Sequence, residues 1–268
     1  MDKHIQDFYR SPAENAPTGH FHDVKCLQKD KGLLWKDLKV LAPDLCRGWY
    51  ELSQLKAVDR VEFSKEYWLA KLPFQPGLAS FFEKFFSGID DVRVYIVQPK
   101  FDDPYEAHLV YSLKQNEGFF RGLSGATEKD FHRLQHQFPK IIFPEDFFAF
   151  LQIHNGFSKT TDSGILKTSE IKPNYEFLQK LIGSKEGLLK SGDYPIDPKN
   201  LIPFYKSFGM PFFQCFYTEW YPRNEMGNVY YSNLTNTISN LSQKGSSTEN
   251  MAFTTFDRWL MFYLEAIS

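Results

Sequence analysis

A short aromatic segment with its own start and stop signals constrains the fold of this chain more than any other feature. The segment runs from Ile142 to Phe157. Pro144 suits the first position of a helix, because its fixed φ is helical and its missing N–H would have no intrahelical partner there. Apolar side chains follow at helical spacing and spread beyond one face, and Asn155-Gly156 supplies the left-handed backbone that ends a helix. We therefore expect a short helix that is buried on more than one side.

Composition and charge exclude several classes of protein. The chain has 268 residues, 17% of them aromatic, which predicts a packed globule and argues against disorder. Its formal net charge is −2, so the whole molecule has no electrostatic attraction to nucleic acid or anionic lipid. The first residues lack the apolar stretch of a signal peptide, and the longest apolar run, Trp259 to Leu264, is too short to cross a bilayer. We expect a cytoplasmic protein with no nucleic-acid partner and no membrane insertion.

The first half of the chain predicts helices followed by a β-hairpin. Residues 1–24 are polar and turn-rich and predict an arm that is ordered only where it docks. Apolar residues then recur first with a helical period and later with the period of two that is typical of strands. The helical patterns cover residues 32–72 and 78–88, and the strand patterns cover residues 92–97 and 106–113.

A glycine-rich stretch predicts a division of the chain into two parts. Gly122-Leu123-Ser124-Gly125 is the best linker candidate, because it combines small residues with two glycines. Residues 1–125 would form an N-terminal helical region plus a β-hairpin, which we expect to pack on the second half. Residues 126–268 would form the second domain.

The second half alternates helices and short strands in an order that suits an α+β fold. Thr127 with Asp130 three residues later predicts a capped helix that runs to Gln137, ahead of the opening aromatic segment. A short strand, a helix, four strand-like runs and a closing amphipathic helix follow. These elements are expected at residues 164–167, 173–182, 201–205, 211–217, 228–231, 235–239 and 253–264. This order favours an α+β domain over a doubly wound sheet.

Several motifs of the second half occur together in one order. The first is Phe143-Pro144-Glu145-Asp146-Phe147, followed by Phe150-Leu151, Asn155-Gly156, Leu201-Ile202-Pro203-Phe204, the aromatic strand from Phe212 to Tyr217, Val229-Tyr230-Tyr231, and Phe253-Thr254-Thr255-Phe256-Asp257-Arg258-Trp259-Leu260. In this order they resemble the SUKH superfamily, which contains Knr-type cell-wall regulators, Syd-like proteins and many bacterial toxin-immunity proteins. Two departures stand out: Thr218 replaces an acidic residue that often ends the aromatic strand, and residues 1–125 have no counterpart in the minimal domain.

The resemblance implies a fold and a kind of function. The fold would be a mixed, mainly antiparallel sheet flanked by helices, here with an N-terminal α/β extension. The family implies no catalytic residue and no cofactor, and a surface that binds another protein. The protein would then be an immunity-type or regulatory module that binds and neutralises or modulates a toxin or an envelope or signalling component.

One loop has the residues of a partner-binding site. It joins two strand-like runs and carries Glu219, Trp220, Tyr221 and Arg223. Trp, Tyr and Arg dominate the energetics of many protein interfaces, so we expect these four residues to contact a partner. The alternative is that Trp220 and Tyr221 pack back onto the sheet and leave only Glu219 and Arg223 in water.

A second class of function, a hydrolase, rests on two histidines. His132 and His136 are four residues apart on an expected helix, which is a spacing at which two imidazoles can share a metal ion. The residues between them lack the glutamate of a zinc-protease helix, and the chain has no Gly-x-Ser-x-Gly motif. Cys215 lies in an apolar strand and is expected to be an inert core thiol. We therefore predict no catalytic residue and no metal site, and keep a metal-dependent or other hydrolase as the alternative.

Overall fold

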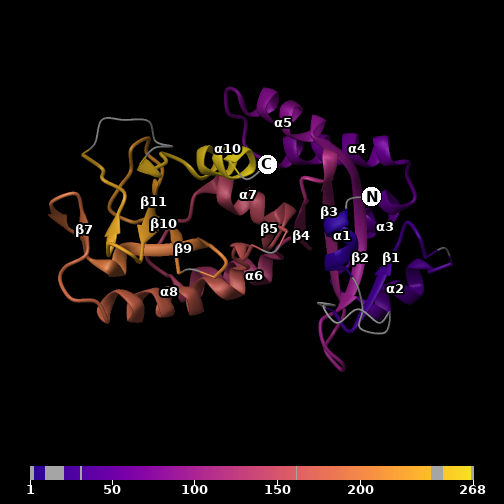
Figure 1. Cartoon of the computed structure of the whole chain (residues 1–268), viewed down its shortest axis with the longest axis horizontal. Coiled ribbons are helices and arrows are strands. Elements are labelled where there is room, and N and C mark those ends of the chain that lie inside the picture. Colours follow the sequence, from indigo (N-terminus) through magenta and orange to yellow (C-terminus); the bar gives the residue numbers. More distant parts are fainter. Residues whose placement is uncertain are drawn as a thin grey trace. The chain divides into compact units, whose positions relative to one another are not determined.

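The chain folds into two compact units, as seen in a computed structural model that describes residues 3–9, 21–30, 32–160, 162–209, 211–242 and 250–266 (Figure 1). The first unit contains the described residues within 1–125 together with residues 153–160. The second contains those within 126–152 and 161–267. The predicted domain boundary after residue 125 stays a prediction, and the short stretch 153–160 belongs with the first unit although it follows that boundary in the chain.

The first unit is built on an antiparallel sheet. Its strands pair in the order β1 (Asp23–Cys26), β2 (Ile89–Gln98), β3 (Glu106–Leu113), β4 (Phe119–Leu123) and β5 (Phe157–Lys159). Successive side chains of a strand point to opposite faces. Val110 and Tyr111 of β3 are both fully buried, so both faces of this sheet are covered.

Helices cover the two faces of this sheet. Several helices precede β2 in the chain: α2 (Trp35–Leu41), α3 (Arg47–Ser53), α4 (Ala57–Lys71) and α5 (Leu78–Ser87). The fully buried Trp68 of α4 packs its ring against Phe82 and Phe86 of α5 and against Tyr111 of the sheet. A 3-10 turn, η2 (Lys114–Asn116), joins β3 to β4.

The opposite face is covered by α1 (Lys3–Phe8). Ile5, Phe8 and Tyr9 belong to one buried cluster with residues of the sheet, and the Tyr9 ring stacks on Tyr95 at 4.2 Å between centroids. Residues 3–9 are therefore ordered where they dock, as expected of the arm. Their helix was not predicted, because a helix of six residues is too short to show a sequence period yet gains its stability from packing. The rest of the expected arm, residues 10–20, lies outside the described residues.

The second unit has the mixed, mostly antiparallel sheet that the sequence predicted, and the α+β fold class is confirmed. Its strands pair in the order β6 (Gly164–Ile165), β9 (Leu201–Lys206), β10 (Phe213–Tyr217), β11 (Asn228–Ser232), β12 (Thr237–Ile238), β7 (Lys190–Ser191) and β8 (Tyr194–Pro195). The pair β12–β7 is parallel, and the other pairs are antiparallel.

Helices lie on both faces of the second sheet (Figure 1). They are α6 (Glu128–Gln137), α7 (Glu145–Ile153), α8 (Thr168–Gly183) and α10 (Phe256–Ala266), with a 3-10 turn η3 (Pro198–Asn200) before β9. Leu178 of α8 shares one buried cluster with Phe213 and Cys215 of β10. Phe216, which follows Cys215 in the strand, points to the other face, where its ring meets that of Phe147 of α7 at 5.0 Å between centroids. None of the helices in the described ranges has the length and apolar character needed to span a bilayer.

The aromatic segment forms the helix that its sequence predicts. It is α7, which begins one residue after Pro144, and Gly156 has the left-handed φ of 109° that follows its end. Phe147, Phe150 and Leu151 are fully buried, which confirms burial on more than one side. The helix is therefore a central part of the packing.

The predicted linker is in part a strand. Gly122 and Leu123 belong to β4, so the linker interpretation was wrong for them. A Cβ at position 122 would overlap the imidazole of His154, which shows that the glycine permits close approach of a side chain. A strand glycine of this kind cannot be distinguished from a linker glycine by its neighbours in the sequence.

Candidate functional site

The candidate partner-binding residues lie in the loop of residues 218–227, which connects β10 to β11. Paired residues from Phe213↔Tyr231 to Phe216↔Asn228 fix the register of the two strands. Backbone hydrogen bonds then close the loop: the amide of Tyr217 donates to the carbonyl of Gly227 at 3.0 Å, and the amide of Gly227 donates to the carbonyl of Trp220 at 2.9 Å. The loop is therefore tied to the sheet through its own backbone.

Trp220 anchors this loop. Its partly buried side chain packs against the cluster that contains Cys215, Val229 and Tyr231. A Cβ at position 227 would overlap the indole ring, so Gly227 is the residue that lets Trp220 lie against the chain. Met226 is also buried, with 2% of its surface exposed. For Trp220 the geometry follows the alternative in which the ring packs back onto the sheet.

The other three candidate residues are exposed. Tyr221 keeps 52% of its surface accessible, and Glu219 and Arg223 are exposed as well. The hydroxyl of Tyr217 donates to Oε2 of Glu219 at 3.3 Å, which ties this carboxylate to the end of β10. The loop thus presents one aromatic ring and two opposite charges, supported from below by the indole.

A buried carboxylate connects two motifs that are far apart in the sequence. Asp146 lies at the start of α7. Its Oδ1 accepts a hydrogen bond from the amide of Phe147 at 2.8 Å, and its Oδ2 accepts one from the amide of Asp257 at 2.9 Å. It therefore caps the first turn of α10 as well as its own helix. Burial raises the pKa of Asp146 to about 7, with a further contribution from the nearby carboxylates of Asp257 and Glu225. Glu225 belongs to the 218–227 loop, so this buried acid also lies near the candidate surface.

The sequence analysis placed Asp146 in a motif at the start of a helix and did not predict its contact with α10. The signal was present, because Asp146 and Asp257 each belong to one of the family-like motifs. The role of Gly227 was missed, since nothing in the sequence shows which residue faces Trp220.

The two histidines that the alternative hydrolase would use for a metal site lie on α6. His132 and His136 are both exposed on α6. Within the described ranges no group of three or more His, Cys, Asp or Glu side chains is arranged to hold a metal ion. Cys215 is fully buried, and burial raises the pKa of its thiol, which suits the core position that the sequence predicted.

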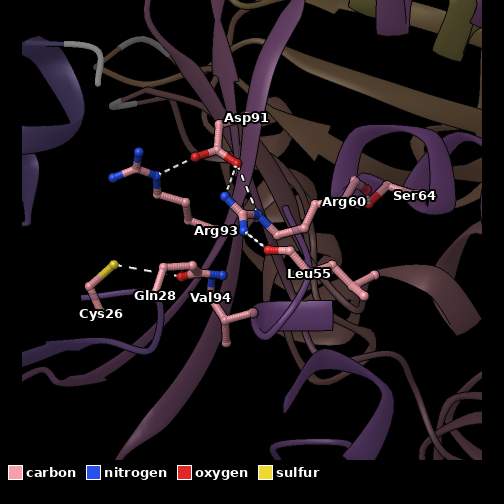
Figure 2. Close-up of polar contacts among 8 residues, drawn as sticks. All are labelled: Cys26, Gln28, Leu55, Arg60, Ser64, Asp91, Arg93 and Val94. Carbon is pink, nitrogen blue, oxygen red and sulfur yellow. Dashed lines mark hydrogen bonds and ion pairs between the residues drawn. The ribbon is translucent and has the colours of Figure 1, made fainter. Parts of the chain in front are cut away.

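A second concentration of polar groups lies inside the first unit (Figure 2). Asp91 follows a β-bulge in β2 and is 6% exposed. Its Oδ1 accepts from Nε and Nη2 of Arg60 at 2.9 and 2.5 Å, and its Oδ2 accepts from Nε of Arg93 at 2.7 Å. Arg60 also donates to the carbonyl of Leu55. Because Asp91 and Arg60 are buried and paired with each other, and Arg93 is half-buried beside them, the cluster is suited to joining α4 to the sheet.

Comparison with known proteins identifies the second half of the chain. A search of curated proteins found no match, and a search of solved structures found none. A sequence model of the SMI1 / KNR4 family (SUKH-1) matches residues 125–261, which is just over half of the 268 residues. The matched range contains α7, the aromatic strand β10, the 218–227 loop and the start of α10. The chain with its helix-flanked, mostly antiparallel sheet belongs to the SMI1 / KNR4 family (SUKH-1).

Proposed function

We propose that this protein is a non-enzymatic binding module that docks another protein through the 218–227 loop. Membership of the SMI1 / KNR4 family supports a role in protein interaction, regulation or immunity. The observation that carries the proposal is the exposure of Tyr221 and Arg223 on a loop whose Trp220 is packed against the sheet.

Tyr221 and Arg223 have the chemistry of interface hot spots. A tyrosine ring buries a large area at low entropic cost, and an arginine can form several hydrogen bonds in one fixed geometry. Because Trp220 and the backbone bonds at Gly227 already hold the loop, a partner would have little loop ordering to offset. The opposite charges of Glu219 and Arg223 would add orientation more than affinity.

The partner would be a toxin or a component of an envelope or signalling assembly, met in the cytoplasm. In the immunity version the protein covers the active or substrate-binding face of a toxin and so neutralises it. In the regulatory version it modulates the assembly that it binds. Both versions need the same docking surface and no chemistry from the SMI1 / KNR4 domain.

The test compares capture of partners from the native cell by the unaltered chain and by chosen variants. Tyr221→Ala with Arg223→Ala should remove the specific partner while leaving the melting temperature unchanged, because both side chains are exposed. The matched control is Tyr194→Ala on β8, a tyrosine with 65% of its surface exposed in the same unit, which should capture normally. Trp220→Ala should lower stability and binding together. Equal capture by the loop double variant and the control would refute the proposal.

A further inference from the structure

A cavity of about 280 Å³ lies inside the first unit. Its walls come from α3, α4 and β3. Ile153 and His154, at the start of the stretch 153–160 that belongs to this unit, complete them. Aromatic and aliphatic side chains form most of the lining: Trp49, Leu52, Phe63, Tyr67, Leu109 and Tyr111. The lining is therefore largely apolar.

Three polar side chains of the lining, Ser64, Tyr111 and His154, have hydrogen-bond partners. The indole Nε1 of Trp68 donates to the hydroxyl of Tyr111 at 3.0 Å, and that hydroxyl lies 2.7 Å from Nε2 of His154. Nδ1 of His154 lies 3.1 Å from the carbonyl oxygen of Leu123, which can only accept, so Nδ1 carries the proton and Nε2 accepts from Tyr111. Ser64 donates its hydroxyl to the carbonyl of Arg60 at 2.8 Å.

The lining is neutral, because its residues include no Asp, Glu, Lys or Arg. Burial lowers the pKa of His154 to about 4, so the imidazole is uncharged near pH 7. The cavity thus offers no ionic partner from this histidine. A charged ligand would lose the hydration of its charge and gain no opposite charge in return. An uncharged ligand would avoid this cost.

Solvent can reach the mouth of the cavity. Cys46 and Gly48 line it and are exposed, and Phe63 keeps 52% of its surface accessible while its ring lies parallel to that of Tyr67. An apolar cavity of about 150 Å³ is enough to bind benzene, so this volume fits a molecule of about two rings. Aromatic walls also favour edge and face contacts with an aromatic ligand.

We propose that this cavity binds a small uncharged molecule with two fused aromatic rings. The ligand sits between α3, α4 and β3 and is selected by size and by the absence of charge. The proposal concerns the first unit alone and does not depend on the docking role of the 218–227 loop.

The test is a fluorescence titration of the full-length protein with 2-naphthol, a neutral probe of this size. We expect saturable binding at one site. 2-Naphthoate has the same rings and a carboxylate, and it should bind at least about tenfold more weakly because its charge would be buried.

Two variants place the probe in the cavity. Ser64→Leu fills the space from α4. It removes the hydroxyl that donates to the carbonyl of Arg60, but this carbonyl still accepts its helical hydrogen bond, so no acceptor is left unsatisfied. Gly48→Leu fills it from the rim of α3, where a Cβ meets nothing within 4 Å and leucine is the better helix former. The matched control is Gly183→Leu, an exposed helical glycine of the second unit with equally open surroundings.

A loss of affinity of at least about tenfold in either folded variant, with Gly183→Leu unchanged, supports the proposal. Three results overturn it: no saturable binding of 2-naphthol by the unaltered protein, both folded variants binding as the unaltered protein does, or 2-naphthoate binding as tightly as 2-naphthol. Thermal unfolding of each variant shows that it is folded before its affinity is compared.

Discussion

Asp91 illustrates how one residue can join distant segments. Its carboxylate lies between the guanidinium groups of Arg60 on α4 and Arg93 on β2, and it is almost fully buried (Figure 2). A buried ion pair adds little net stability compared with apolar residues, but removal of one partner leaves charge uncompensated in a medium of low polarity. Asp91 is thus more important for what its loss would expose than for what its presence adds.

Asp91→Asn should therefore lower the free energy of unfolding by about 3–5 kcal/mol, because the buried Arg60 and the half-buried Arg93 would lose their common counter-charge. Urea unfolding followed by circular dichroism measures the change. Asp90→Asn is the matched control on the same strand, where the side chain is exposed and the expected change is below about 0.5 kcal/mol. Equal losses from the two variants would contradict the assigned role.

Asp146 should make stability depend on pH. Its folded-state pKa of about 7 lies above the ordinary value of 3.8, mainly because the carboxyl is buried. Between these two values the folded chain binds more protons than the unfolded chain, so this group's contribution lowers the free energy of unfolding as pH rises from about 4 to 7. Above pH 7 both states are deprotonated and the contribution is constant.

Asp146→Asn should flatten this pH dependence, since the amide does not titrate. The difference between the two proteins should amount to a few kcal/mol in total, at about 1.4 kcal/mol per pH unit. Denaturant titrations at pH 4, 5.5, 7 and 8 measure it. Glu145→Gln removes the exposed neighbouring carboxylate and should leave the slope unchanged. A variant as pH-dependent as the unaltered chain would show that Asp146 is not the titrating group.

At the scale of helices and strands, elements with local signals were predictable. Thr127 and Asp130 form the expected reciprocal cap: the amide of Asp130 donates to Oγ1 of Thr127 at 3.3 Å, and the amide of Thr127 donates to Oδ2 of Asp130 at 2.9 Å. The strand expected over residues 106–113 has these limits as β3. Local geometry alone specifies such features.

Elements that depend on distant partners were not predictable. α1 is stabilised by packing of Phe8 and Tyr9 on the sheet. The sequence of its six residues alone does not predict this packing. β4 contains Gly122, which interrupts the alternation that marks a strand. The reason for that glycine is His154, more than thirty positions later in the chain, so only the folded structure reveals it.

Gly122→Ala should destabilise the protein. The added methyl group would overlap the imidazole of His154, and overpacking of this kind typically costs about 1–3 kcal/mol. Gly183→Ala should change stability in the opposite direction by up to about 1 kcal/mol, because that glycine is helical and its surroundings are open. Thermal unfolding of both variants provides the comparison. A melting temperature for Gly122→Ala at or above that of the unaltered chain would disprove the close approach.

At the scale of the whole molecule, the sequence predicted the position of the 218–227 loop between two strands, but not how the loop is packed. The loop between two aromatic strands was expected to carry Trp220, Tyr221 and Arg223, and the structure places all three there. Which of them is packed and which are exposed was not predictable, because this depends on which ring meets Gly227 once β10 and β11 are paired. Residue type identifies interface chemistry, whereas tertiary packing decides which residues remain exposed.

The segment 153–160 bears on where the chain can be divided. It lies within the range that matches the SMI1 / KNR4 family, yet it belongs to the first unit. β5 pairs with β4 there, and Phe157, with 2% of its surface exposed, packs against Trp68 and Phe120. A cut after residue 125 would separate these residues from every one of those partners.

We therefore predict that a fragment of residues 126–268 does not unfold cooperatively on its own, because Phe157 and Ile153 would be left exposed, at about 1.5–3 kcal/mol for each side chain. Co-expression with a fragment of residues 1–125 should restore cooperative unfolding by supplying β4 and Trp68. Thermal unfolding and binding of a hydrophobic dye measure both states. The control is the same fragment with Phe157→Ser, which should bind less dye alone and regain less stability with the first fragment. Cooperative unfolding of residues 126–268 alone, with little dye bound, would instead favour the boundary after residue 125 that the sequence predicts.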